Sequence, residues 1–325
     1  MTCGQTIRDI TATVATSGVD SGCRHTEDPV VSDAWPVTEP AGLIALQLCS
    51  VRGRQLLAYR LVQVGTLFAL LLKLPFLIDA ANAYVELPIY QDFFSPLFSS
   101  AAVVIGTYLL TCIAIGFNFS CKKDRLRSAS TSIPVIGLSI LCIHQGSYND
   151  MTFTTAWWAM LWSLWFAGRI DESDAYLIDR GARLSRTILS VILLGGAAGK
   201  WTAEYWSGQV LYEIYFVDRD FWIYNWLRTS FSPDTVREIA TWYSRQVVVV
   251  ETVVGLTLWA MPSRMAAAVG LAVLASIAIF SNYYLLSVLL SLIALAAVGF
   301  LVPKRPQSLD LAGEPNGPEA SRSEA

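Results

Sequence analysis

Long apolar runs recur through most of this sequence and leave few folds open to it. Each run holds close to twenty residues, which is the length that an α-helix needs to cross the hydrocarbon core of a bilayer. Charged residues make up only 15% of the chain, whereas soluble domains carry about 25%. Hydrophobic residues make up 54%, and the mean hydropathy is +0.47. The sequence therefore predicts an all-α fold, a polytopic transmembrane helical bundle.

Eight apolar runs predict eight transmembrane helices. They lie at 57–79, 98–118, 129–147, 151–168, 184–201, 246–261, 265–281 and 283–302. The sequence on either side of this region is rich in small, polar and acidic residues, which predicts disordered cytoplasmic tails at residues 1–50 and 304–325. The predicted transmembrane domain occupies residues 51–303.

The loop charges predict that both termini lie in the cytoplasm. Alternate loops carry clusters of Lys and Arg, and the short loops between them at 80–97, 145–150 and 281–284 carry none. The clusters lie at Arg52 and Arg54, at Lys122 to Arg127, at Arg169 to Arg186, at Arg264, and at Lys304 and Arg305. Basic loops stay on the cytoplasmic side of a membrane, so an even number of spans satisfies the pattern. Because these charges flank the spans, they do not indicate a nucleic-acid partner.

One outer loop, residues 202–245, is much longer than the others. Between Trp201 and Tyr243 the sequence places 13 aromatic residues, together with basic and acidic side chains. Two interpretations stay open. The rings form a belt at headgroup depth in the membrane interface, or the segment forms a partly helical lid over an outward-facing cavity.

Ionisable residues within the spans gather toward the outer side of the membrane in this topology. Such residues are costly in a bilayer and mark pairing or function. The sequence therefore predicts an outward-facing polar pocket with three catalytic candidates, Lys200, Glu251 and His144. Further pocket or lid residues are Lys73, Asp150, Glu204, Trp206, Gly208 and Asn282.

Each catalytic candidate has a structural alternative. Lys200 is either a desolvated base or an anchor that reaches the headgroups. Glu251, within QVVVVETVVG, pairs with a cation or relays protons. His144 is either a general base or a hydrogen-bonded residue at a helix end. The six cysteines and two histidines show no metal-ligand spacing, so no metal site is predicted.

Several short segments, in order along the chain, resemble the HTTM domain, the membrane module of vitamin K-dependent γ-carboxylases and related bacterial proteins. GGAAGKWTAEYWSG (195–208) is similar to the family's Gly-Lys and Trp-Gly stretch. Tyr59–Arg60, LPIYQDFFSPLF (87–98), HQGSYND (144–150), and Glu251 followed by Pro262 and Arg264 resemble further family segments. The resemblance covers roughly residues 55–302.

This resemblance implies an integral membrane protein, of the bacterial inner membrane, that acts on a quinone, reduced vitamin K or another lipid-soluble substrate. It places Lys200 at the family's catalytic base and His144 near its outer histidine. Lys200 and Trp206 are one residue further apart than in the usual motif, and the late-helix histidine is missing from AIFSNYY (278–284). The chain also ends after the last run, without a large lumenal domain. A DoxX-like quinone-linked partner without its own catalysis is an alternative, and a small transporter is a third class. The lipid bilayer is the one partner that all three share.

Overall fold

The computed structural model describes residues 50–86, 101–121, 124–143, 151–171, 173–280 and 283–303. Within these ranges the regular elements are all helices, which confirms the predicted all-α class. The predicted tails lie outside the described residues, apart from residue 50.

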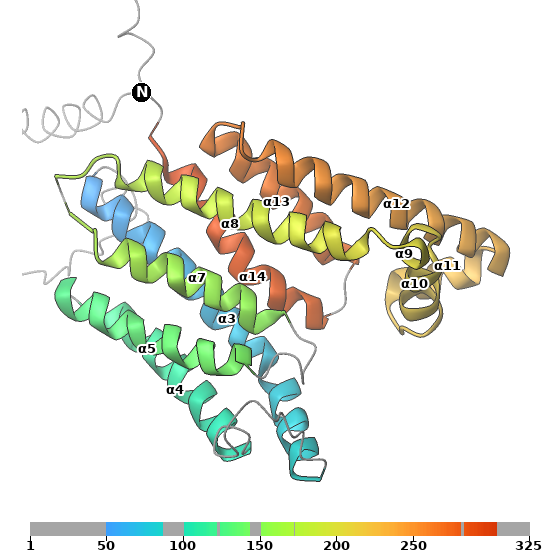
Figure 1. Cartoon of the computed structure of the whole chain (residues 1–325), viewed down its shortest axis with the longest axis horizontal. Coiled ribbons are helices and arrows are strands. Elements are labelled where there is room, and N and C mark those ends of the chain that lie inside the picture. The colour runs from blue at the N-terminus through green and yellow to red at the C-terminus, as the bar shows by residue number, and fades with distance from the viewer. Residues whose placement is uncertain are drawn as a thin grey trace, which may run out of the picture.

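Eight helices of at least 15 residues make up most of the described chain (Figure 1). They are α3 (Val51–Glu86), α4 (Ala101–Ser120), α5 (Asp124–Ile143), α7 (Thr152–Ala167), α8 (Leu177–Lys200), α12 (Pro233–Thr257), α13 (Ser263–Phe280) and α14 (Tyr283–Ala297). Each of the eight predicted apolar runs overlaps one of these helices. A 3₁₀ turn, η3 (Val298–Leu301), extends α14.

Three of these helices are long and apolar enough to cross a membrane: Val51–Asp79 in α3, Ala102–Phe119 in α4 and Leu126–Ile143 in α5. Two shorter apolar helical stretches cover Ser263–Ile279 and Leu285–Leu301. The structure thus shows a helical protein with candidate membrane spans. Eight crossings and the predicted orientation stay predictions.

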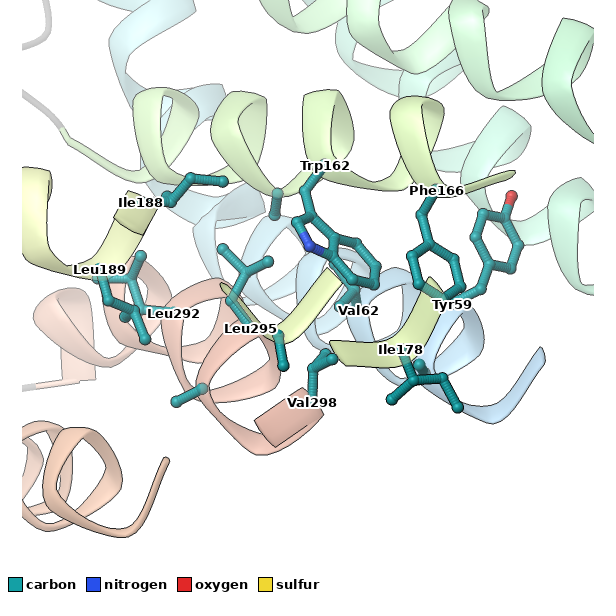
Figure 2. Packing of buried hydrophobic residues seen from close by; sticks show 14 of the residues in the cluster. Tyr59, Val62, Trp162, Phe166, Ile178, Ile188, Leu189, Leu292, Leu295 and Val298 are labelled. Atoms are coloured by element: carbon teal, nitrogen blue, oxygen red, sulfur yellow. The ribbon is translucent and has the colours of Figure 1, made fainter. Parts of the chain in front are cut away.

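The larger hydrophobic cluster joins α3, α7, α8 and α14 (Figure 2). Its centre is Trp162, whose indole ring stacks on Phe166 with ring centroids 4.6 Å apart. A β-carbon at Gly181 of α8 would lie 2.7 Å from the Phe166 ring, so the glycine allows α8 to approach α7. The Trp162 indole N–H donates to the Gly181 carbonyl over 2.9 Å, which satisfies the one polar atom of the buried ring.

A second cluster joins α3, α4, α5 and α7. Hydroxyl groups in and beside this cluster form hydrogen bonds between its helices. The hydroxyls of Tyr59 and Thr131 lie 2.8 Å apart, and the Tyr108 hydroxyl donates to the Leu70 carbonyl. Pro75 and Pro134 lie inside α3 and α5, where each removes a backbone donor.

Residues 201–232, between α8 and α12, fold into short helices that pack on the first turns of α12 (Figure 1). These are α9 (Ala203–Trp206), α10 (Gln209–Leu211), the π-helix η2 (Tyr212–Val217) and α11 (Trp222–Ser230). We call this segment the aromatic unit. Its core joins Leu211, Phe216 and Tyr224 to Val236 and Ala240 of α12.

Candidate functional site

The candidate site is built around an ion pair between two of the three catalytic candidates. The Lys200 ammonium group donates to Glu251 Oε1 over 2.5 Å and so joins the last residue of α8 to α12. The Glu251 side chain is 8% exposed and the Lys200 side chain 29%. A buried carboxylate needs such a partner, because an unpaired charge in this environment costs several kcal/mol.

Small residues bring α8 and α12 close enough for this pair to form. A β-carbon at Gly255 of α12 would lie 2.8 Å from the Leu194 side chain of α8, and one at Gly196 would lie 3.5 Å from Glu251 Oε2. Below the pair, the Ser190 hydroxyl donates to the Gly255 carbonyl over 2.5 Å. Gly196 and Gly255 therefore allow close packing of α8 and α12 at the site, whereas Gly195 and Gly199 have no neighbouring atom within 4 Å of a new β-carbon.

The second carboxylate oxygen of Glu251 is buried and, among the described residues, has no hydrogen-bond partner. Glu251 also lines a cavity of about 140 Å³ between α12 and α13. The lining residues are Tyr243, Gln246, Val247, Val250, Glu251, Val273, Ser276 and Ile277. The site thus combines an acceptor lacking a donor with an adjacent, partly polar space.

The cavity opens on the side of the bundle, between α12 and α13, and extends inward to the Glu251 carboxylate. Successive residues of an α-helix are turned by about 100°, so Gln246, Val250, Tyr243 and Glu251 follow one another around α12. Gln246 and Val250 are exposed on the side of the bundle, and Glu251 is buried. α12 packs mainly on α8, whereas α13 packs mainly on α14, and the two helices leave their connecting turn in different directions (Figure 1).

The aromatic unit covers the end of the site that carries Lys200. The Tyr205 ring centroid lies 5.9 Å from Lys200 Nζ, within reach of a cation–π contact. Burial raises the pKa of the Tyr205 hydroxyl, and the nearby Glu251 carboxylate raises it further. The Trp201 indole N–H donates to Thr252 of α12 over 3.3 Å. Aromatic side chains therefore lie beside both partners of the ion pair.

The predicted pocket or lid residues of this segment have structural contacts of their own. Gly208 has a φ of 80° and lies against the Thr241 backbone, so only glycine fits this turn between α9 and α10. The Trp206 ring stacks on Trp201 with centroids 5.2 Å apart. Glu204 is exposed in the first turn of α9.

Lys73 lies elsewhere in the bundle. It is 3% exposed, on the α3 face that also carries Leu70 and Leu77, and its ammonium group is 3.8 Å from the Phe76 ring centroid. It is not among the residues that line the cavity beside Glu251. His144, Asp150 and Asn282 lie outside the described residues, so their predicted places in the pocket stay predictions.

Four polar or aromatic residues of the site were not singled out from the sequence. They are Tyr205, Tyr243, Gln246 and Ser276. Tyr243 precedes Glu251 by about two helical turns, but Gln246 lies about 140° from it around α12, so helical spacing alone does not bring Gln246 to the site. Nothing in the sequence pairs Ser276 of α13 with α12.

The comparisons with known proteins identify no relative of this chain. No protein-family model, no curated protein and no solved structure matches the chain. The function is therefore inferred from the site alone, with the resemblance of its short segments beside it.

Proposed function

We propose that this chain is an integral membrane protein that binds a lipid-soluble molecule with a hydroxyl-bearing head, a quinol in the first instance, beside Glu251. The observation that carries the proposal is the buried Glu251 carboxylate, which gives one oxygen to Lys200 and leaves the other without a donor next to a cavity. A buried acceptor without a donor is unfavourable by about 1–3 kcal/mol, and a ligand hydroxyl relieves that cost.

The cavity volume favours a ligand with a single-ring head. An engineered apolar cavity of about 150 Å³ in another protein holds one benzene molecule, and the cavity here measures about 140 Å³. A single quinol ring fits such a space, and the two fused rings of reduced vitamin K are larger. The apolar tail then extends past Val250 and Ile277 into the bilayer, because the cavity meets the side of the bundle there.

Ligand entry from the bilayer requires α12 to cross the membrane, and the distribution of its side chains supports this. Trp242 and Trp259 are both exposed, and Val249, Val253 and Leu256 are exposed between them. α12 ends at Thr257, and its residues 242–257, at about 1.5 Å each, cover about 24 Å, close to the thickness of a hydrocarbon core. Tryptophan prefers the two interfaces, and the exposed Arg245 and Gln246 lie one turn inside Trp242, so Glu251 lies in the outer half of the membrane.

The proposed topology has eight spans, α3, α4, α5, α7, α8, α12, α13 and α14, with both termini in the cytoplasm of a bacterial cell. Its support is the alternation of basic and uncharged loops. In this orientation Lys200 and the aromatic unit lie on the outer side. The HTTM resemblance, which places Lys200 at the family's catalytic base, is a second support.

The test is binding of decylplastoquinol, a short-chain quinol with a small single-ring head, to the purified protein in lipid nanodiscs. Glu251→Leu removes the acceptor, and we expect its affinity to fall about tenfold, the equivalent of one lost hydrogen bond to a charged group. Val253→Ala, on the lipid-facing side of the same helix, is the matched control and should bind as the wild type does. Equal affinities in all three proteins would falsify the proposal.

Lys200→Arg separates a binding site from a catalytic one. Arginine stays charged at any accessible pH, so it keeps the ion pair but cannot act as a base. Binding and turnover that both survive in Lys200→Arg indicate an ion pair that only orients Glu251. If Lys200→Arg binds the quinol but loses turnover that the wild type shows, the lysine takes part in proton transfer.

A further inference from the structure

We infer that the aromatic unit, residues 201–232, is embedded in the headgroup region of the lipid bilayer, and that Trp222 and Trp226 of α11 insert between the lipids. The unit is then a lipid-docking surface and not a domain that projects into water. This inference concerns a different surface from the cavity beside Glu251.

The depth of the unit follows from the helix on which it packs. Along the exposed side of α12, Asp234 and Glu238 give way within one turn to Trp242. Arg245 and Gln246 are exposed on the next turn, and from Val249 to Leu256 the exposed residues are apolar. Such a change from charged to aromatic to aliphatic side chains marks a membrane interface. The core of the unit contacts Val236 and Ala240 of α12, so the unit lies at that level.

The exposed side of α11 has the character of an interfacial helix. Trp222 and Trp226 are one turn apart and lie opposite the buried Tyr224, with exposures of 63% and 54%. The Phe231 ring meets Trp226 edge to face, with centroids 5.8 Å apart, and is itself exposed. Large rings exposed together on one side of a short helix favour the headgroup–hydrocarbon boundary, where their apolar bodies and polar N–H groups are both satisfied.

Backbone carbonyls of the aromatic unit accept hydrogen bonds from protein side chains, as a segment in a layer poor in water requires. Carbonyls at the end of a helix normally bind water, but here side chains take its place. The Arg228 guanidinium donates to the carbonyls of Phe216, Val217 and Arg219 at the end of η2.

Side chains of α12 satisfy the end of α9 in the same way. The carbonyls of Tyr205, Trp206 and Ser207 accept from Ser244, Arg245 and Thr241, respectively. An irregular segment at membrane depth needs internal donors of this kind, because lipid supplies none.

The experiment uses the eleven native tryptophans and needs no label. Fluorescence of the wild type in nanodiscs is compared with that of the double variant Trp222→Tyr, Trp226→Tyr, so that the difference reports these two rings. The nanodiscs contain phosphatidylcholine brominated either high on the acyl chain or near its end, and iodide serves as the aqueous quencher. Trp162→Tyr is the control, because its ring is buried in the bundle and should respond to no quencher.

We expect the difference signal to be quenched about twofold more by lipid brominated high on the chain than by lipid brominated near its end, and only weakly by iodide. A signal quenched by iodide and by neither lipid would mean that the unit stands in water. A signal that no quencher reaches would mean that protein covers α11, and either result overturns the inference. The single variants repeat the measurement if the double variant does not fold.

Discussion

The first half of the bundle (α3, α4 and α5) and the second half (α8 and α12) satisfy their buried polar groups in different ways. In α3, α4 and α5, hydroxyls mostly bond within their own helix, as Thr66 does to the Val62 carbonyl over 2.8 Å and Ser139 does to that of Val135 over 2.8 Å. Between α8 and α12, two polar contacts join the two helices, the Lys200–Glu251 pair and the bond from Ser190 to the Gly255 carbonyl. The three helices that are apolar enough to cross a membrane all belong to the first half.

This difference contributes to the lower hydropathy of α8 and α12, whereas α13 and α14 are apolar but shorter. A hydroxyl that bonds to its own helix adds little polarity to a long apolar run, so the span remains recognisable. A charged pair divided between two helices lowers the hydropathy of both, although each charge is neutralised after folding. The residues that build a site thus weaken the signal by which a span is detected.

The largest expected effect comes from breaking the ion pair. Glu251→Ala leaves Lys200 without its buried partner, so we expect the free energy of unfolding to fall by about 3 kcal/mol. Unfolding in mixed micelles of dodecyl sulfate and dodecyl maltoside measures it. Val253→Ala, which faces lipid on the same helix, should cost less than about 1 kcal/mol. Similar losses in both variants would show that the pair does not stabilise the second half.

Gly208 tests whether the aromatic unit is fixed to α12 by backbone contact. Alanine there must adopt a φ of 80° and press against the Thr241 backbone, so we expect a loss of about 2 kcal/mol. Gly199 of α8 is the matched control, because no neighbouring atom lies within 4 Å of the position of a new β-carbon. Gly199→Ala should be neutral or stabilising by about 0.5 kcal/mol, since alanine is the better helix former. The same unfolding assay compares them, and a harmless Gly208→Ala would contradict the tight turn.

Two hydroxyl deletions compare the halves directly. Ser190 of α8 donates to the Gly255 carbonyl and accepts from the Trp259 indole N–H, both over 2.5 Å. Ser190→Ala should therefore cost about 1.5 kcal/mol, because two polar groups of other residues lose their partner. Thr66→Ala removes only a bond within α3 and should cost about 0.5 kcal/mol. Equal losses would remove the distinction between the halves.

The smallest expected effect is a loss of stability at alkaline pH in the aromatic unit. Burial raises the pKa of Tyr224 from 10 to about 12. The folded state then keeps a proton that the unfolded state releases, so this contribution is complete below pH 10 and declines as the pH rises toward 12. We expect a decline of about 1 kcal/mol between pH 10 and pH 11. Unfolding at these two values measures it, and Tyr224→Phe should make the decline shallower; an unchanged slope would exclude Tyr224 as its source.

The sequence alone predicted the positions of the helices and singled out the two residues of the ion pair. Apolar runs predicted the positions of eight helices, and the cost of burying Glu251 predicted that it needs a cation. Helix ends were harder to predict. α12 begins at Pro233, well before its apolar run, because Ser232 caps it and its first turns are polar. Local capping, and not hydropathy, determines that end.

The arrangement within residues 201–232 was beyond prediction from the sequence. The aromatic content indicated either a belt or a lid, but the division into α9, α10, η2 and α11 depends on contacts with residues far along the chain. Arg228, Thr241 and Ser244 act as caps for carbonyls that no local pattern identifies. Ser276 joins the cavity for the same reason, through the path of α13 relative to α12.

The central claim is that Lys200 and Glu251 act as one pair inside the bundle, and a double-mutant cycle tests it most directly. The cycle combines Lys200→Met and Glu251→Leu, singly and together, and measures the free energy of unfolding of each protein in mixed micelles. We predict a coupling energy of about 2 kcal/mol, with the double variant much more stable than the sum of the single losses implies. Losses that add within about 0.5 kcal/mol would contradict the pairing on which the proposed site rests.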